Sequence, residues 1–253
     1  MVHFIGAGPG DPELITIKGQ RLISEADVII YAGSLVNPEI LKYGKKGAEV
    51  YNSATMNLDE VLKVEIEAVR EGKTVARVHT GDPAIYGAIQ EQMDALKKEG
   101  IDYDVIPGVS SFLASAAALK QEYTLPDVSQ TIIITRMEGR TPMPPKEKLR
   151  SLAQHGATMC IFLSVQMIEK VVSELEEGGY APDTPVAIVV RATWPDQRII
   201  RGTLATIADI LHKEGVLRQA MIIVSRVLDS DYKLSKLYDK GFTTMFRKGT
   251  DEK

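Results

Sequence analysis

Short apolar runs alternate with segments of helical period over the first 119 residues. The apolar runs lie at residues 3–6, 27–31, 74–79 and 104–106. The segments between them place apolar residues three or four positions apart, as Leu58, Leu62, Ile66 and Val69 do, which is typical of one face of a helix. These segments lie at 14–25, 58–71, 86–98 and 110–119. The order predicts βαβ units, with a parallel sheet covered by helices on its faces.

A polar, turn-rich stretch over residues 121–130 interrupts this pattern, and the alternation then starts again. Strands are predicted at 131–135, 158–163, 185–190 and 221–227, and helices at 146–154, 167–177 and 204–213. The run at 197–201, which follows Trp194-Pro195-Asp196, predicts an antiparallel return of the chain. We therefore expect two α/β domains, residues 1–118 and 119–253. Ligand sites often lie between such domains or at the carboxyl ends of parallel strands.

Composition narrows the class of protein. The chain has 253 residues and 44% hydrophobic content, which is enough for a substantial core. Its formal net charge of -4 and the absence of a long basic run argue against a nucleic-acid partner. The single cysteine, Cys160, and four histidines without ligand spacing predict no metal site. No signal peptide or membrane-length apolar run is visible, so we expect a cytoplasmic protein with no membrane partner.

The segment FIGAGPGD, residues 4–11, suggests a nucleotide-binding loop. A dinucleotide fingerprint requires a third glycine three residues after the second, where this chain has Asp11. It also requires an acidic residue after the second strand, but that run ends in Ala32-Gly33. A Gly-Lys-Ser/Thr phosphate loop is absent as well. This disfavours a nicotinamide oxidoreductase and predicts at least a tight turn, with Asp11 as N-cap and Pro12 opening a helix.

Glycine turns follow three of the predicted strands in the first half. They read GAGPGD at residues 6–11, HTGDPAIYG at 79–87 and PGVSS at 107–111. Because the carboxyl ends of parallel strands meet at one edge of a sheet, we expect the three turns to gather there. Glycine can serve only the backbone conformation of a turn, but it also lets a ligand approach the main chain closely. Three such turns on one edge favour a ligand site.

These turns resemble those of the tetrapyrrole methylases that use S-adenosylmethionine, and the likeness covers nearly the whole chain. GAGPGDPELIT, RVHTGDPAIYG and VIPGVSS carry the family resemblance. YAGSLV, GDPAIYGAIQEQMDAL, PDVSQTIIITRMEGRTPMP and ATWPDQRIIRGTL are more specific, and resemble members that methylate precorrin-4, with or without cobalt, at ring carbon 11. The resemblance implies the tetrapyrrole methylase fold with the active-site cleft between its two domains, S-adenosylmethionine as methyl donor, a tetrapyrrole substrate and a homodimer.

Two alternatives to methylation of precorrin-4 remain open. One is another tetrapyrrole methylase, acting on uroporphyrinogen or a different precorrin, and the other is a tetrapyrrole-binding protein without catalysis. The methylases of uroporphyrinogen carry an aspartate, proposed as a base, where this chain has Ala32. No base is therefore assigned at that position.

The resemblance also assigns residues to the cofactor. These are Pro9, Thr80, Gly81, Asp82, Ile85, Ser110, Ser111, Leu163 and Ala192. Asp82 is expected to cap its turn as well, and Leu163 can equally be an ordinary core residue.

His79 and Tyr86 are catalytic candidates because they lie beside the second glycine turn. Arginine suits the many carboxylates of a tetrapyrrole, since its guanidinium pairs with them through two hydrogen bonds. The substrate-binding candidates are Arg77, Arg136, Arg140 and Arg191, and the alternative for each is a solvated surface group.

Overall fold

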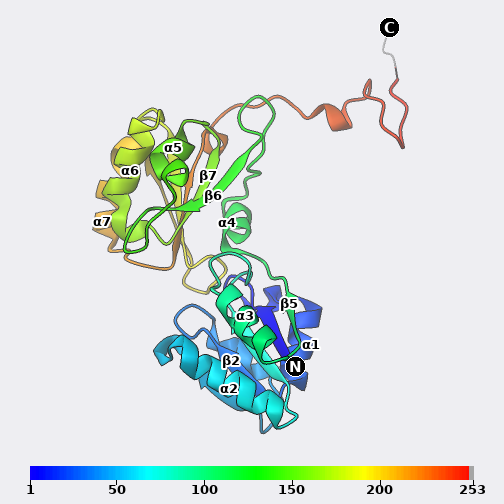
Figure 1. Cartoon of the computed structure of the whole chain (residues 1–253). Helices are drawn as coiled ribbons and strands as arrows, with labels where there is room; N and C mark the ends of the chain where they lie inside the picture. The colour runs from blue at the N-terminus through cyan, green and yellow to red at the C-terminus, as the bar shows by residue number, and fades with distance from the viewer. Residues whose placement is uncertain (251–253) are drawn as a thin grey trace. The chain divides into compact units, whose positions relative to one another are not determined.

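The computed structural model describes residues 1–250, which form two compact units (Figure 1). The first unit comprises Met1–Ser115 together with Arg191–Gln197. The second contains Ala116–Val190 and the chain from Arg198 onward. The division falls inside helix α4 (Ser111–Leu119), slightly before the predicted boundary at residue 118. No local sequence pattern predicts that Arg191–Gln197 groups with the first unit.

The first unit contains a five-stranded sheet in which every neighbouring pair is parallel. Its strand order is β3-β2-β4-β1-β5. The strands are β1 (Val2–Gly6), β2 (Val28–Tyr31), β3 (Glu49–Asn52), β4 (Val75–His79) and β5 (Tyr103–Ile106). Four of the five were predicted. Because all strands run the same way, the turns that follow them share one edge.

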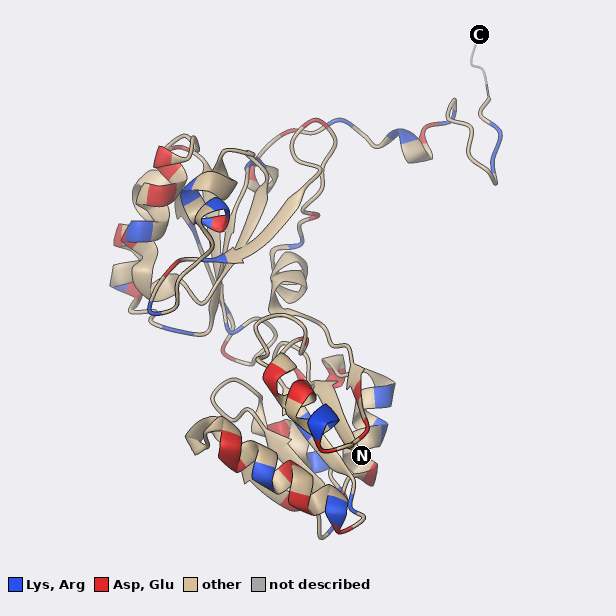
Figure 2. Cartoon of the chain, viewed as in Figure 1, with Lys and Arg blue, Asp and Glu red and all other residues tan. Residues whose placement is uncertain are grey.

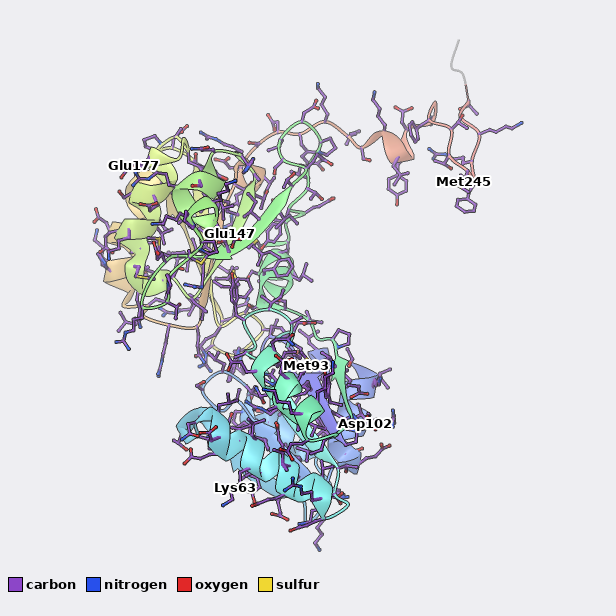
Figure 3. All side chains as sticks on the ribbon, in the orientation of Figure 1. Lys63, Met93, Asp102, Glu147, Glu177 and Met245 are labelled. Carbon is purple, nitrogen blue, oxygen red and sulfur yellow. The ribbon has the colours of Figure 1, made fainter. Side chains whose placement is uncertain are left out.

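Helices cover both faces of this sheet (Figure 1). The helix α1 (Ile17–Glu25) and the 3₁₀ helix Pro38–Tyr43 pack on one face, and α2 (Leu58–Arg70) and α3 (Gln90–Lys98) pack on the other. Lys63, labelled in Figure 3, stands on the exposed side of α2. Lys and Arg alternate with Asp and Glu along the outer side of α2 (Figure 2).

Two predicted helix starts in the first unit are wrong. The helix predicted from residue 86 begins at Gln90, because Tyr86 and Ala88 adopt left-handed backbone angles, with φ of 55° and 49°. Asp11 does accept a hydrogen bond from the Glu13 amide, but the element it caps is a 3₁₀ helix, Pro12–Leu14. The helix α1 begins later, with Thr16 as its N-cap.

The second unit contains a mixed five-stranded sheet in the order β6-β7-β10-β8-β9. Its strands are β6 (Ile132–Arg136), β7 (Thr158–Phe162), β8 (Pro185–Val190), β9 (Arg198–Thr203) and β10 (Ala220–Val224). The strands β6 and β7 are parallel, and β10 runs antiparallel to both β7 and β8. The pairing of β8 with β9 confirms the predicted antiparallel return.

One face of the second sheet packs against α5 (Leu149–Ala153), α6 (Ile168–Glu177) and α7 (Leu204–Glu214), as Figure 1 shows. Cys160 is a fully buried residue of β7, and burial raises the pKa of its thiol to about 12. None of the helices over residues 1–250 combines the length and the apolar character that a membrane span needs.

Candidate active site

The three glycine turns meet at one edge of the first sheet, as predicted. The strands β4, β1 and β5 are neighbours, so the turns that leave them are neighbours too. Gly8 and Gly81 exchange two backbone hydrogen bonds, of 3.3 and 2.8 Å, and the Ala7 amide donates to the His79 carbonyl at 2.8 Å. The first two turns are thus joined through their main chains.

Close approach of the backbones explains the glycines. A Cβ atom on Gly108 would lie 2.1 Å from the carbonyl oxygen of Gly81 and 2.8 Å from Cα of Gly6. These are distances that no side chain tolerates against a backbone. Gly81 also has a φ of +60°, which is the left-handed region that glycine enters freely. The third turn therefore packs directly on the first two.

The Asp82 carboxylate links two of these turns. One oxygen accepts a hydrogen bond from the Ala84 amide at 2.8 Å, and the other accepts one from the Gly108 amide at 2.9 Å. The first bond closes Asp82's own turn, as the sequence suggested, and the second ties the turn after β4 to the turn after β5. Both oxygens of Asp82 are engaged by the protein itself, so its first role is to hold the edge in shape.

Tyr86 lies on a strained segment at this edge. It and Ala88 have left-handed φ angles, which cost on the order of 1–3 kcal/mol each and persist only where the surroundings enforce them. The Gln92 side chain donates to the Ala88 carbonyl at 2.8 Å, and Arg77 in turn donates to the Gln92 side-chain oxygen at 3.0 Å. Tyr86 is 46% exposed, so solvent reaches its side chain at this edge.

Arg77 is an interior residue, which contradicts its assignment to the substrate. Only 7% of it is exposed. Besides Gln92, its guanidinium donates to the Ile30 carbonyl at 3.3 Å and to the Ser53 hydroxyl at 3.1 Å. It also lies 3.9 Å from Glu65, which is fully buried on α2. A rim carboxylate of a substrate cannot reach this group.

His79 is enclosed as well, and this removes it as a base. It is 4% exposed, and its Nε2 atom has no hydrogen-bond partner among residues 1–250. Burial, and secondarily the charge on Arg77, lowers the pKa of His79 to about 3. The imidazole is therefore neutral at physiological pH and binds a proton too weakly to act as a general base there.

The loop Arg191–Gln197, between β8 and β9, lies against the GAGPGD turn within the first unit. The Trp194 indole N–H donates to the Pro9 carbonyl at 3.1 Å, and the Asp11 amide donates to the Thr193 hydroxyl at 2.9 Å. Arg191 is occupied in the same loop, because it forms an ion pair with Asp196 at 2.7 Å. Ala192 is buried.

The remaining candidates belong to the second unit. Leu163 is 64% exposed with a φ of 55°, so it is not the core residue that it could equally have been. Arg136 folds back on its own loop and donates to the carbonyls of Met137, Thr141 and Pro142 at 3.3, 3.2 and 3.1 Å. Arg140 is exposed. Arg136 therefore shapes the loop, and Arg140 is presented to solvent.

Several residues that shape the site were missed by the sequence interpretation. The first glycine turn is contacted from distant parts of the chain by Thr193 and Trp194, and by Asn37, whose side chain donates to the Gly10 carbonyl at 2.9 Å. No local pattern signals such contacts. Glu65 did carry a signal, because it lies four residues after Val61 on the apolar face of α2. An acidic residue at such a position indicates a buried partner. That partner is Arg77.

Fold and turns together define a two-unit α/β protein with a candidate ligand site at the carboxyl edge of a parallel sheet. The described residues hold no group of three or more His, Cys, Asp or Glu side chains placed to bind a metal. The chain belongs to the family of tetrapyrrole (corrin/porphyrin) methylases, whose pattern it matches over residues 1–208.

Three curated relatives match almost the whole chain. The cobalt-precorrin-4 C(11)-methyltransferase of Methanocaldococcus jannaschii is 63% identical, over 98% of this chain and 96% of that protein. The enzyme of the same name from Priestia megaterium is 51% identical, over 98% of each protein. The precorrin-4 C(11)-methyltransferase of Pseudomonas aeruginosa is 47% identical, over 98% of this chain and 99% of that protein.

Two solved structures are similar in fold. The X-ray structure of a cobalt precorrin-4 methyltransferase has a TM-score of 0.88 at 50% identity, covering 90% of this chain and 96% of that one. A uroporphyrin-III C-methyltransferase from Thermus thermophilus, complexed with S-adenosylhomocysteine, has a TM-score of 0.76 at 29% identity. The match to it covers 90% of this chain and 93% of that one.

Proposed function

We propose that this protein transfers a methyl group from S-adenosylmethionine to ring carbon 11 of cobalt-precorrin-4, a step of cobalamin biosynthesis. The observation that carries the proposal is the 63% and 51% identity, over nearly the full chain, to two enzymes named for this reaction. The Pseudomonas aeruginosa relative, whose name gives precorrin-4 without cobalt, is 47% identical. The difference favours the cobalt-containing substrate.

The sheet edge formed by the three glycine turns, here called the glycine edge, suits S-adenosylmethionine better than a phosphate-bearing cofactor. The amides of Gly8 and Gly81 are turned to each other, so they do not form an open cradle of N–H groups. The turns 6–11, 79–87 and 107–111 contain no lysine or arginine. S-adenosylmethionine carries no phosphate, and its adenine, ribose and zwitterionic amino acid can be bound by main-chain groups and hydroxyls. We propose the following residues of the first unit as its site: Pro9, Thr80, Gly81, Asp82, Ile85, Ser110, Ser111 and Ala192.

Leu163 of the second unit is proposed as a further cofactor contact. It is a large apolar side chain, held exposed by a left-handed backbone directly after β7. Such strain clusters at ligand sites, where the surrounding structure enforces it.

When bound, S-adenosylmethionine supplies an electrophilic methyl group on a sulfonium. The protein's part is to align that methyl group with an electron-rich ring carbon, about 3–3.5 Å away, and to exclude water. Asp82 and the three packed glycine turns fix the edge for this purpose. No base is required before the attack, which fits the neutral, enclosed His79 and the presence of Ala32. Tyr86 remains the catalytic candidate as a proton relay, because its hydroxyl can receive the proton that the ring loses while releasing its own proton to water.

Arg140 and Arg191 are the proposed contacts for substrate carboxylates. Arg140 is exposed on a loop that Arg136 stabilises through three backbone carbonyls. Arg191 already pairs with Asp196, which is 64% exposed at its side chain, so a carboxylate of the substrate would compete with a solvated partner. Charge-assisted contacts of this kind contribute about 1.5–3 kcal/mol, and less where solvent reaches them.

The decisive test is a methylation assay with isotope-labelled S-adenosylmethionine. Cobalt-precorrin-4, metal-free precorrin-4 and uroporphyrinogen III are offered in parallel, and the products are identified by mass and by the labelled carbon. The proposal expects fastest turnover with cobalt-precorrin-4 and the label at carbon 11. Preference for metal-free precorrin-4 refutes the choice of substrate, and label in uroporphyrinogen III refutes the place in the pathway.

We further propose that the protein is a cytoplasmic homodimer, by resemblance to the family. Analytical ultracentrifugation at micromolar concentration tests this directly, and a monomer at all concentrations rejects it.

A further inference from the structure

The loop Arg191–Gln197 holds the first glycine turn by its main chain. Trp194 donates its indole N–H to the Pro9 carbonyl at 3.1 Å, and Thr193 accepts the Asp11 amide at 2.9 Å. Trp194 lies 185 positions after Pro9 in the sequence, and Thr193 lies 182 positions after Asp11. The two bonds involve the residues directly before and after Gly10, so the loop holds the backbone of the turn at both positions.

The indole also defines the shape of the turn. A Cβ atom on Gly10 would lie 2.1 Å from Cδ1 of Trp194, so only glycine permits the ring to lie against the backbone. The Asn37 side chain donates to the Gly10 carbonyl at 2.9 Å. Pro9 and Gly10 are therefore fixed by side chains from two different segments of the chain.

The loop is itself stiffened. Arg191 and Thr193 have φ angles of 49° and 69°, which non-glycine residues rarely adopt. The Arg191 guanidinium stands over the Trp194 ring, 4.0 Å from its centroid, and the Thr193 amide donates to the Gln197 side chain at 2.7 Å. The contact surface for the glycine turn is thus held in place by the loop's own contacts.

We propose that Trp194 is a positioning residue for S-adenosylmethionine. Its indole fixes the Pro9–Gly10 backbone in the shape that receives the cofactor, and Thr193 fixes the Asp11 amide beside it. This rests on the proposed function, because it takes Pro9 to be part of the cofactor site. The chain contains one tryptophan, so the fluorescence of Trp194 reports on this turn alone.

The test uses the full-length protein and S-adenosylhomocysteine as the probe. Titration of the wild type should change the tryptophan emission and saturate at the Kd that calorimetry gives. Trp194→Phe keeps an aromatic ring but loses the indole N–H and the five-membered ring that carries it, so calorimetry should show the Kd raised at least about three- to tenfold, which is the loss of one neutral hydrogen bond. Thr193→Val should have a similar effect, and Thr193→Ser, which keeps the acceptor, should restore wild-type affinity.

A role in folding alone gives a different result. It lowers the thermal midpoint and the calorimetric stoichiometry, but leaves the Kd of the folded fraction unchanged. Arg198→Ala is the matched control, because Arg198 lies on β9 just outside the loop and pairs only with Glu214 at 3.1 Å among the contacts over residues 1–250. It should leave the Kd unchanged.

Two outcomes overturn the inference, and they are distinguishable. If the wild type binds the probe while Trp194→Phe and Thr193→Val bind it equally well, the loop does not position the cofactor, and the proposed function stands. If the wild type shows no calorimetric binding, the proposed function fails and the inference fails with it.

Discussion

Replacement of Asp82 by alanine should destabilise the protein and weaken cofactor binding together. The substitution removes the acceptor for two backbone amides, those of Ala84 and Gly108. Loss of the bond from the Ala84 amide should lower the free energy of unfolding by about 1 kcal/mol, as loss of a helix cap does. The second leaves a half-buried amide unpaired between two packed turns, at about 1–3 kcal/mol. The sum is about 2–4 kcal/mol.

This magnitude is measurable by thermal unfolding. A loss of 1 kcal/mol shifts the midpoint by about 2–4 °C in proteins of 150–250 residues, so Asp82→Ala should lower it by about 5–15 °C. Asp82→Asn is the matched variant, because the amide keeps one oxygen acceptor at the same position. Its shift should lie between those of the wild type and the alanine variant.

The cofactor side is measured on the same samples. The Kd for S-adenosylhomocysteine should rise more for Asp82→Ala than for Asp82→Asn, as the loss of stability does. The reason is that the turn after β4 and the turn after β5 lose the hydrogen bond that links them. An alanine variant that unfolds at the wild-type temperature but no longer binds would refute this reasoning. It would show that the carboxylate contacts the cofactor and does not hold the turns.

The sheet and the glycine edge were predictable because their signals are local. Apolar runs of strand length and helical spacing between them are properties of neighbouring residues, and they gave four strands of the first sheet and the return in the second. The strand β3 was missed because it is an edge strand, where Glu49 and Asn52 face solvent and no apolar run forms. Edge strands lack the pattern that burial on two faces produces.

The assignment of side chains within the site was less predictable, because it depends on contacts between distant segments. Arg77 and His79 alternate with Val75 on one face of β4, and that face packs on α2 and α3. Their sequence neighbours, the glycines of the turn, suggested exposure, whereas the strand geometry buries them. The link from Asp82 to Gly108 crosses 26 residues, and the contact of Trp194 with Pro9 crosses 185. Proximity of these residues follows from the fold alone.

Three further predictions concern packing, substrate capture and pH. Gly108→Ala should abolish probe binding and lower the thermal midpoint sharply, because its Cβ would lie 2.1 Å from the Gly81 carbonyl oxygen; unchanged binding in calorimetry would contradict the packing. Arg140→Ala should raise the Michaelis constant for the tetrapyrrole and leave cofactor affinity unchanged, and identical steady-state kinetics at low salt would exclude the contact.

Burial raises the pKa of Glu65 from 4.5 to about 7, so the folded state holds a proton that the unfolded state releases. The contribution of Glu65 to stability is therefore complete below pH 4.5 and is lost as the pH rises through 7. His79, whose pKa burial lowers from 6.5 to about 3, acts in the opposite sense, because its contribution is lost as the pH falls below 6.5. The two slopes oppose each other between pH 4.5 and 6.5 in the wild type. Glu65→Gln removes one of them, so chemical denaturation should show the variant gaining stability relative to the wild type from pH 5 to pH 8, by up to about 3 kcal/mol at 1.36 kcal/mol per pKa unit. Parallel stability curves for the two proteins would mean that Glu65 is already ionised in the folded state at acidic pH and that Arg77 compensates its burial in full.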